Sequence, residues 1–204
     1  MKLKEKLLIY LMRKESSYFW SFVDMLAYKL DKIAEIYDKR SVGNEYRKEY
    51  RAVGISENDK ILHVGCGAYP ITAITLAKIN GVHIVGIDKN PKAVELAKDL
   101  IHRKKLDKKI KIENGDGINY PVGKFNTIII SSCSTPKEKI LEHILRNAKP
   151  KSKIIARDLD PAAQIVTDSI ALHSDIVLVE KIRHYPSQFY ELSGWQSFYL
   201  IKKQ

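Results

Sequence analysis

The hydrophobic pattern of the chain changes character near residue 60. Before it, apolar residues recur at steps of three and four, which is the period of an amphipathic helix. The pattern predicts a short first helix ending near Leu11 and a second over residues 19–37, with Ser16 or Ser17 as its cap. A third helical stretch covers residues 45–52. Because no Gly/Pro/Ser-rich linker follows, we expect these helices to pack on the remainder of the chain.

From Lys60 onwards, short apolar runs alternate with helical stretches. Strands are expected at residues 61–64, 82–87, 110–113, 126–131 and 153–156, and an antiparallel pair at 176–182 and 198–201. Helices are expected at 70–79, after the cap Asn90, at 139–148 behind a capping box at 135–138, and at 161–173. Continuous β-branched strands alternating with helices are typical of a parallel sheet covered on both faces. The prediction is an α/β, Rossmann-like, doubly wound domain over residues 55–204, preceded by a helical extension over 1–54.

Composition limits the remaining possibilities. Two cysteines cannot build a disulfide framework, and no His/Cys spacing indicates zinc. No apolar run approaches the ~20 residues of a membrane span, so we expect no membrane insertion and a cytoplasmic location. Abundant Lys and Ile with scarce Gln are typical of thermophiles. The net charge of +11 is spread along the chain, which favours a solvated basic surface but leaves RNA as an alternative partner.

Chemistry is most strongly indicated at the ends of the predicted parallel strands. Gly65, Cys66 and Gly67 directly follow the first strand of the predicted sheet, where glycine lets the backbone turn sharply and approach a ligand. Asp88 ends the second strand, where a carboxylate can accept both ribose hydroxyls, and Asp116 ends the third, where it can bind an adenine amino group. Together they predict a site for an adenosine-containing ligand. Four neighbours complete the candidate cofactor site: Lys89, Gly117, Ser131 and Ser132.

Pro70 narrows the choice of adenosine ligand. The dinucleotide fingerprint G-x-G-x-x-G requires a third glycine at this position, so NAD becomes the minor alternative. The phosphate-binding motif G-x-x-x-x-G-K-[ST] is missing from the sequence, which argues against an NTPase.

Successive motifs resemble those of class I S-adenosylmethionine-dependent methyltransferases. They are Val64-Gly65-Cys66-Gly67, Gly86-Ile87-Asp88, Asn114-Gly115-Asp116 and Phe125-Asn126-Thr127-Ile128-Ile129-Ile130. The resemblance implies a seven-stranded sheet whose last strand is antiparallel, with S-adenosylmethionine as cofactor. It also implies that Gly65 and Gly67 face the methionine part, Asp88 the ribose and Asp116 the adenine.

A narrower resemblance leaves the transferred group open. Gly67-Ala68-Tyr69-Pro70-Ile71-Thr72 is similar to a segment of archaeal nicotianamine synthase-like proteins, which transfer an aminocarboxypropyl group instead of methyl. We therefore predict methyl transfer to a small polar or amine acceptor, with aminocarboxypropyl transfer as the alternative. An RNA methyltransferase or RNA-binding protein is a third possibility, and a homodimer is compatible with the sequence.

Candidate catalytic residues are less well defined. Under the synthase resemblance, Glu49 is expected to bind or deprotonate an acceptor amine; otherwise it belongs to the exposed face of its helix. Tyr69 either closes on the cofactor or acceptor, or shields the start of the next helix. An aromatic-rich segment near the final hairpin either forms one wall of the acceptor pocket or packs between the hairpin and the sheet; it contains His184, Tyr185, Phe189, Tyr190 and Trp195. Cys133 is expected to be a small packed residue.

Overall fold

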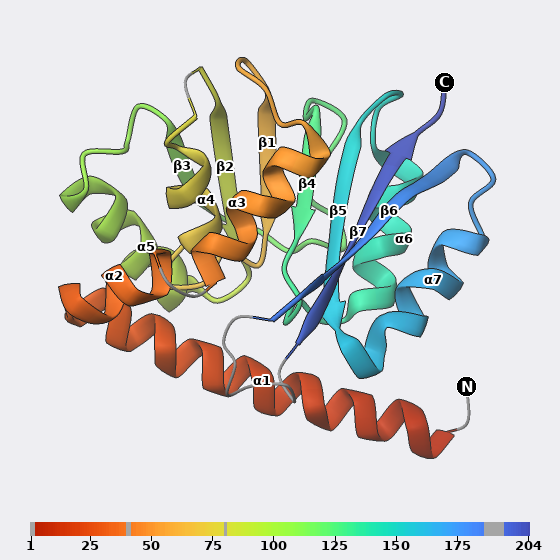
Figure 1. Cartoon of the computed structure of the whole chain (residues 1–204), viewed down its shortest axis with the longest axis horizontal. Coiled ribbons are helices and arrows are strands. Elements are labelled where there is room, and N and C mark those ends of the chain that lie inside the picture. The colour runs from red at the N-terminus through yellow and green to blue at the C-terminus, as the bar shows by residue number, and fades with distance from the viewer. Residues whose placement is uncertain (1–2, 40–41, 80, 186–193) are drawn as a thin grey trace.

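A computed structural model of the chain describes residues 3–39, 42–79, 81–185 and 194–204 (Figure 1). Its centre is a seven-stranded sheet of order β3-β2-β1-β4-β5-β7-β6. The first five strands run parallel, and β7 is antiparallel to both of its neighbours, β5 and β6. The predicted Rossmann-like α/β fold is confirmed.

The elements follow the predicted alternation closely. The strands are β1 (Lys60–Val64), β2 (His83–Asp88), β3 (Ile110–Asn114), β4 (Thr127–Ile130), β5 (Lys153–Leu159), β6 (Ile176–His184) and β7 (Trp195–Lys202). The helices are α1 (Leu3–Lys29), α2 (Asp31–Lys39), α3 (Val42–Val53), α4 (Ile71–Leu76), α5 (Pro91–Arg103), α6 (Lys137–Asn147) and α7 (Ala163–Ala171), with a 3₁₀ turn at Asp160–Ala162. As predicted, Asn90 caps α5, accepting a hydrogen bond from the Lys92 amide at 3.0 Å.

Hydrophobic cores lie on both faces of the sheet because successive strand residues point to opposite sides. Ile61 and Ile129 pack with residues of α3, α4 and α5. Their strand neighbours Leu62 and Ile128 pack with residues of α6 and α7 on the other face. Burial on both faces explains why the strands read as continuous apolar runs rather than alternating ones.

The first two helices of the N-terminal extension are separated at Leu30, and not between Leu11 and residue 19 as predicted. Helix α1 is continuous for 27 residues and passes through Ser16 and Ser17, so the predicted cap there is wrong. A serine caps a helix only where the backbone leaves the helical conformation; here the Ser16 hydroxyl lies 3.4 Å from the Cys133 sulfur instead. Helix α1 ends at Lys29, and after Leu30 the helix α2 begins. No helix in the described ranges is long and apolar enough to cross a membrane.

Helix α1 runs across the lower ends of the strands in Figure 1. The Arg13 guanidinium donates hydrogen bonds to both carboxylate oxygens of Asp158 on β5. Near the other end of the helix, the Tyr28 hydroxyl donates to Asp99 of α5 at 2.7 Å. These contacts hold α1 against the carboxyl end of β5 and against α5.

The capping box predicted before α6 is also wrong, because the helix begins at Lys137 without a side-chain cap. The buried ammonium group of Lys137 donates to the backbone carbonyls of Ser131 and Arg157. Lys137 therefore ties the ends of β4 and β5 together, and burial lowers the pKa of its ammonium group to about 8.

Candidate functional site

A cavity of about 460 Å³ opens at the carboxyl ends of the central strands. Its lining includes the glycine loop after β1, the ends of β2 and β4, and residues from α1, α2 and α3. The volume falls within the range typical of small-molecule sites. The cavity therefore lies at the position where open parallel sheets bind ligands.

The two loop glycines are required by both conformation and space. Gly65 and Gly67 have φ angles of +76° and +69°, a region that residues with a Cβ rarely adopt. A Cβ at Gly65 would collide with the Ser134 hydroxyl, and one at Gly67 with the Asp24 carboxylate. The loop is anchored through Gly65 and Cys66, whose amides donate to the Ile87 carbonyl at 2.9 and 3.0 Å.

Asp88 and Asp116 both line the cavity, as predicted. Each also supports its own loop: Asp88 accepts hydrogen bonds from the amides of Gly67 at 3.0 Å and Asn90 at 2.9 Å. Asp116 accepts one from the Ile118 amide at 3.1 Å. Since a carboxylate has about four acceptor positions, both retain capacity for a ligand.

The remaining predicted cofactor residues also line the cavity, in different ways. Cys66 is buried, and burial raises the pKa of its thiol, which fits a packing role. The Ser131 hydroxyl donates to the Gly65 carbonyl at 2.9 Å, and the Lys89 ammonium to the Thr135 carbonyl at 2.8 Å. Gly117 packs so tightly on β1 that a Cβ would lie 2.6 Å from Val64. Ser132 lies in the loop after β4.

His63 adds a buried acceptor that the sequence did not reveal. Its Nε2 lies 2.8 Å from the Ser131 hydroxyl oxygen. Because that hydroxyl already donates to Gly65, Nε2 must carry the proton, which leaves Nδ1 as a bare acceptor. Nδ1 has no hydrogen-bond partner among the described residues. Burial, reinforced by the Arg157 charge, lowers the pKa of His63 to about 3, so the ring is neutral.

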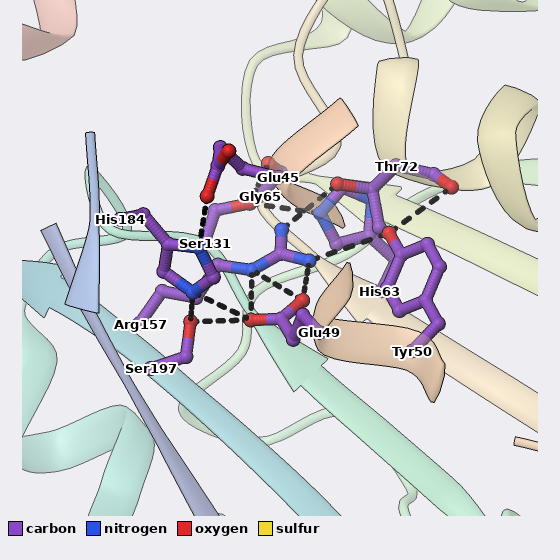
Figure 2. Close-up of polar contacts among 10 residues, drawn as sticks. All are labelled: Glu45, Glu49, Tyr50, His63, Gly65, Thr72, Ser131, Arg157, His184 and Ser197. Carbon is purple, nitrogen blue, oxygen red and sulfur yellow. Dashed lines mark hydrogen bonds and ion pairs between the residues drawn. The ribbon is translucent and has the colours of Figure 1, made fainter. Parts of the chain in front are cut away.

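Buried charged and polar side chains contact one another close to the cavity-lining residues His63 and Ser131 (Figure 2). We call Glu45, Glu49, Arg157, His184 and Ser197 the buried charge cluster. The Arg157 guanidinium donates to both carboxylate oxygens of Glu49, and the Ser197 hydroxyl donates to one of them. His184 lies between Ser197, at 3.0 Å, and Glu45, at 3.2 Å. Burial lowers the pKa of His184.

The structure buries Glu49 next to the cavity wall. It is 0 % exposed, so the alternative of an exposed helix face is wrong. Its helix packs against the sheet, and the carboxylate faces Arg157 on β5. Glu49 is not part of the cavity lining; its neighbour Tyr46 is, with Arg157 stacked over the ring at 3.7 Å. A direct catalytic role for Glu49 stays a prediction.

Aromatic residues form much of the cavity wall. Tyr69 lines the cavity and contacts Tyr37, with ring centroids 5.8 Å apart. Trp195 also lines it and stacks on His184 at 4.8 Å. Phe189 and Tyr190 lie outside the described residues. Within the described part of the chain, no group of three or more His, Cys, Asp or Glu is placed to hold a metal ion.

Comparison with known proteins gives a family match over most of the chain. A family model described as a methyltransferase domain matches residues 55–199. Norajmaline N-methyltransferase from Rauvolfia serpentina is 29 % identical over 114 residues, which cover 51 % of this chain and 39 % of that protein. L-Histidine 2-aminobutanoyltransferase from Yersinia pestis is 29 % identical over 119 residues, covering 57 % and 44 %. The matched regions thus span less than half the length of these relatives.

Solved structures show the same fold. A mutant of MtNAS in complex with S-adenosylmethionine has a TM-score of 0.75 at 17 % identity, covering 100 % of this chain and 80 % of that one. The [4+2]-cyclase SpnF has a TM-score of 0.65 at 14 % identity, covering 78 % and 81 %. The match to MtNAS therefore includes the N-terminal helices, whereas the match to SpnF leaves about a fifth of this chain uncovered.

Proposed function

Because the chain belongs to the methyltransferase domain family, we propose that it transfers a methyl group from S-adenosylmethionine to a small polar or amine acceptor. The observation that carries this proposal is the cavity itself. It brings the positive-φ glycine loop together with Asp88 and Asp116, at successive strand ends, in one space of about 460 Å³.

The residues present fit this cofactor. Glycines at 65 and 67 leave open the space that a Cβ would fill, so a ligand can approach the backbone closely. Asp88 and Asp116 offer acceptors for ribose hydroxyls and an adenine amino group. When bound, S-adenosylmethionine supplies an electrophilic carbon attached to a sulfonium, which an acceptor attacks in line.

The protein's own contribution is positioning and exclusion of water. Trp20 and Met25 of α1 line the cavity, so the helix covers the site that the strand ends open. Holding donor and acceptor in one geometry supplies much of the acceleration of a displacement, and no base is needed when the acceptor amine arrives unprotonated. Tyr46, Leu159 and Trp195 form the cavity wall contributed by α3, β5 and β7, and we assign the acceptor to this side.

Aminocarboxypropyl transfer is the second candidate. It is supported by the similarity to MtNAS over the whole chain, N-terminal helices included, and by the Yersinia pestis relative named as an aminobutanoyltransferase. In this alternative the acceptor attacks a different carbon on the same sulfonium. Glu49 is the residue proposed under this resemblance for the acceptor amine, and Tyr69 is proposed, from its place in the glycine loop, to close on the cofactor or the acceptor.

One labelling experiment decides between the two candidates. The protein is incubated with S-adenosylmethionine labelled either in the methyl group or in the carboxyl carbon, and with a panel of small amines and imidazoles that includes histidine. Methyl transfer labels the acceptor from the first donor and yields S-adenosylhomocysteine. Aminocarboxypropyl transfer labels it from the second and yields methylthioadenosine. Absence of S-adenosylmethionine binding by calorimetry would refute both candidates.

Three further predictions from the sequence, namely RNA binding, homodimer formation and a cytoplasmic location, remain predictions.

A further inference from the structure

Helix α1 places a carboxylate directly against the glycine loop. Asp24 is only 9 % exposed and lines the cavity. Its Oδ2 lies so close to Gly67 that a Cβ at that glycine would overlap it. Asp24 and the glycine loop therefore line the same part of the cavity.

The groups around Asp24 do not balance its charge. From α2, the Tyr37 hydroxyl donates to Oδ1 at 3.4 Å, and from the loop the backbone amides of Tyr69 and Ala68 contribute hydrogen bonds. The nearby charged group from β2 is Asp88, which has the same sign. Among the described residues, no Lys, Arg or His forms an ion pair with Asp24.

A buried carboxylate without a cation is costly in its ionised form. Burial, with a smaller contribution from Asp88, raises the pKa of Asp24 to about 8. Buried carboxylates elsewhere in the chain have cationic partners: Asp158 is paired with Arg13, and Glu49 with Arg157. Asp24 is thus set apart as a buried acid that faces a ligand cavity instead of a cation of the protein.

We propose that Asp24 binds the ammonium group of the methionine part of S-adenosylmethionine, which makes α1 a structural part of the cofactor site. The inference rests on the proposed function. Gly67, against which Asp24 lies, belongs to the loop assigned by resemblance to the methionine part. An ammonium group offers three N–H donors and a positive charge, and so matches a carboxylate that has neither a cation nor a full set of donors.

Cofactor binding should then displace a proton. In the free protein at pH 7 the Asp24 carboxyl is mostly protonated, whereas an ammonium beside it favours the carboxylate. The proton that leaves Oδ passes to the buffer, and the ammonium keeps its own. Binding of a ligand that lacks the ammonium should leave the carboxyl protonated.

Three ligands separate this charge from the rest of the cofactor. S-Adenosylmethionine and S-adenosylhomocysteine both carry the ammonium, only the first carries the sulfonium, and methylthioadenosine carries neither. By calorimetry at pH 7, we expect Asp24→Asn to weaken the first two by roughly 10- to 100-fold, as expected for loss of a charge-assisted hydrogen bond. Affinity for methylthioadenosine should change less than about twofold.

Calorimetric titrations in buffers of different ionisation enthalpy measure how many protons are released on ligand binding, which provides a second readout. Wild type should release close to one proton with S-adenosylmethionine and almost none with methylthioadenosine, and Asp24→Asn should release none with either. Asp99→Asn is the matched control, because Asp99 also contacts α1 but lies outside the cavity lining. It should leave both readouts unchanged.

The outcomes separate the two proposals. Equal weakening of all three ligands by Asp24→Asn would mean that Asp24 only shapes the loop, and unchanged binding would remove it from the site. Either result overturns this inference while S-adenosylmethionine binding by wild type still supports the proposed function. Wild-type protein that binds none of the three ligands would overturn both.

Discussion

Two carboxylates from the N-terminal helices, Glu49 and Asp24, are both withdrawn from solvent, but their surroundings are opposite. Glu49 accepts hydrogen bonds from a guanidinium and a hydroxyl inside the buried charge cluster. Asp24 faces a tyrosine hydroxyl, two amides and the cavity. Burial alone therefore does not distinguish a structural acid from a ligand-binding one. The presence of a cation within the fold does, because an ion pair already made leaves no charge for a ligand.

The largest expected effect is a loss of unfolding free energy when Glu49 is replaced. Glu49→Ala leaves the Arg157 guanidinium buried without its partner, and breaking such a pair typically costs about 3–5 kcal/mol. Urea unfolding should show a loss of this size. Replacing both partners, as Glu49→Leu with Arg157→Met, should recover most of the stability, because neither charge then remains buried. A loss below about 1 kcal/mol for the single variant would contradict the structural role.

Asp24 should have the opposite effect on stability, and the effect should depend on pH. Its pKa is about 8 in the folded protein and near the ordinary 3.8 when unfolded, so the folded state holds the extra proton between these values. Stability from this group is complete below about pH 4 and is lost as the pH rises towards 8. Ligand-free wild type should therefore lose on the order of a few kcal/mol relative to Asp24→Asn over this range. Parallel pH profiles of unfolding free energy would count against the raised pKa.

Asp88 variants test the part of the cavity proposed to hold the ribose. Asp88→Ala removes an acceptor for the ribose and should weaken S-adenosylmethionine binding by about 2 kcal/mol, a value typical of hydrogen bonds to charged groups. Asp88→Asn keeps one oxygen for the Gly67 or Asn90 amide and should fall between the alanine variant and wild type. Asp107→Ala, at an exposed carboxylate, is the calorimetric control. Equal affinity in all four proteins would exclude Asp88 from the site.

The smallest expected effect is on the stability of alanine variants at two glycines. It separates the cost of backbone strain from the cost of the close contact between Gly67 and Asp24. Gly54 and Gly67 have similar positive φ angles, but a Cβ at Gly54 meets nothing within 4 Å. Gly54→Ala should cost only the strain, about 1 kcal/mol. Gly67→Ala should cost about 1 kcal/mol more, because the Asp24 carboxylate must move, and it should also weaken cofactor binding. Equal costs in thermal unfolding, with binding intact, would show that the contact between Gly67 and Asp24 is unimportant.

Much of the doubly wound domain could be predicted from the sequence because its signals are local. Runs such as Thr127–Ile130, the Asn90-Pro91 helix start and the glycines at 65 and 67 each report a conformation decided within a few residues. The helix caps predicted at Ser16 and Thr135 were wrong because a local signal does not show where the backbone leaves the helix. A capping side chain acts only if the backbone leaves the helix there, and packing against the rest of the chain decided otherwise.

The sequence by itself determined the sheet and the strand ends at which the glycine loop, Asp88 and Asp116 meet the cavity, since strand ends and turn glycines are encoded in neighbouring residues. Only the tertiary structure decided which acids are neutralised. Arg157 lies 108 positions from Glu49, and Asp24 meets a loop more than 40 residues further along the chain. Burial and ion pairing depend on groups that only folding brings together. The division between a charge that holds the fold and one that faces the cavity therefore cannot be predicted from local pattern.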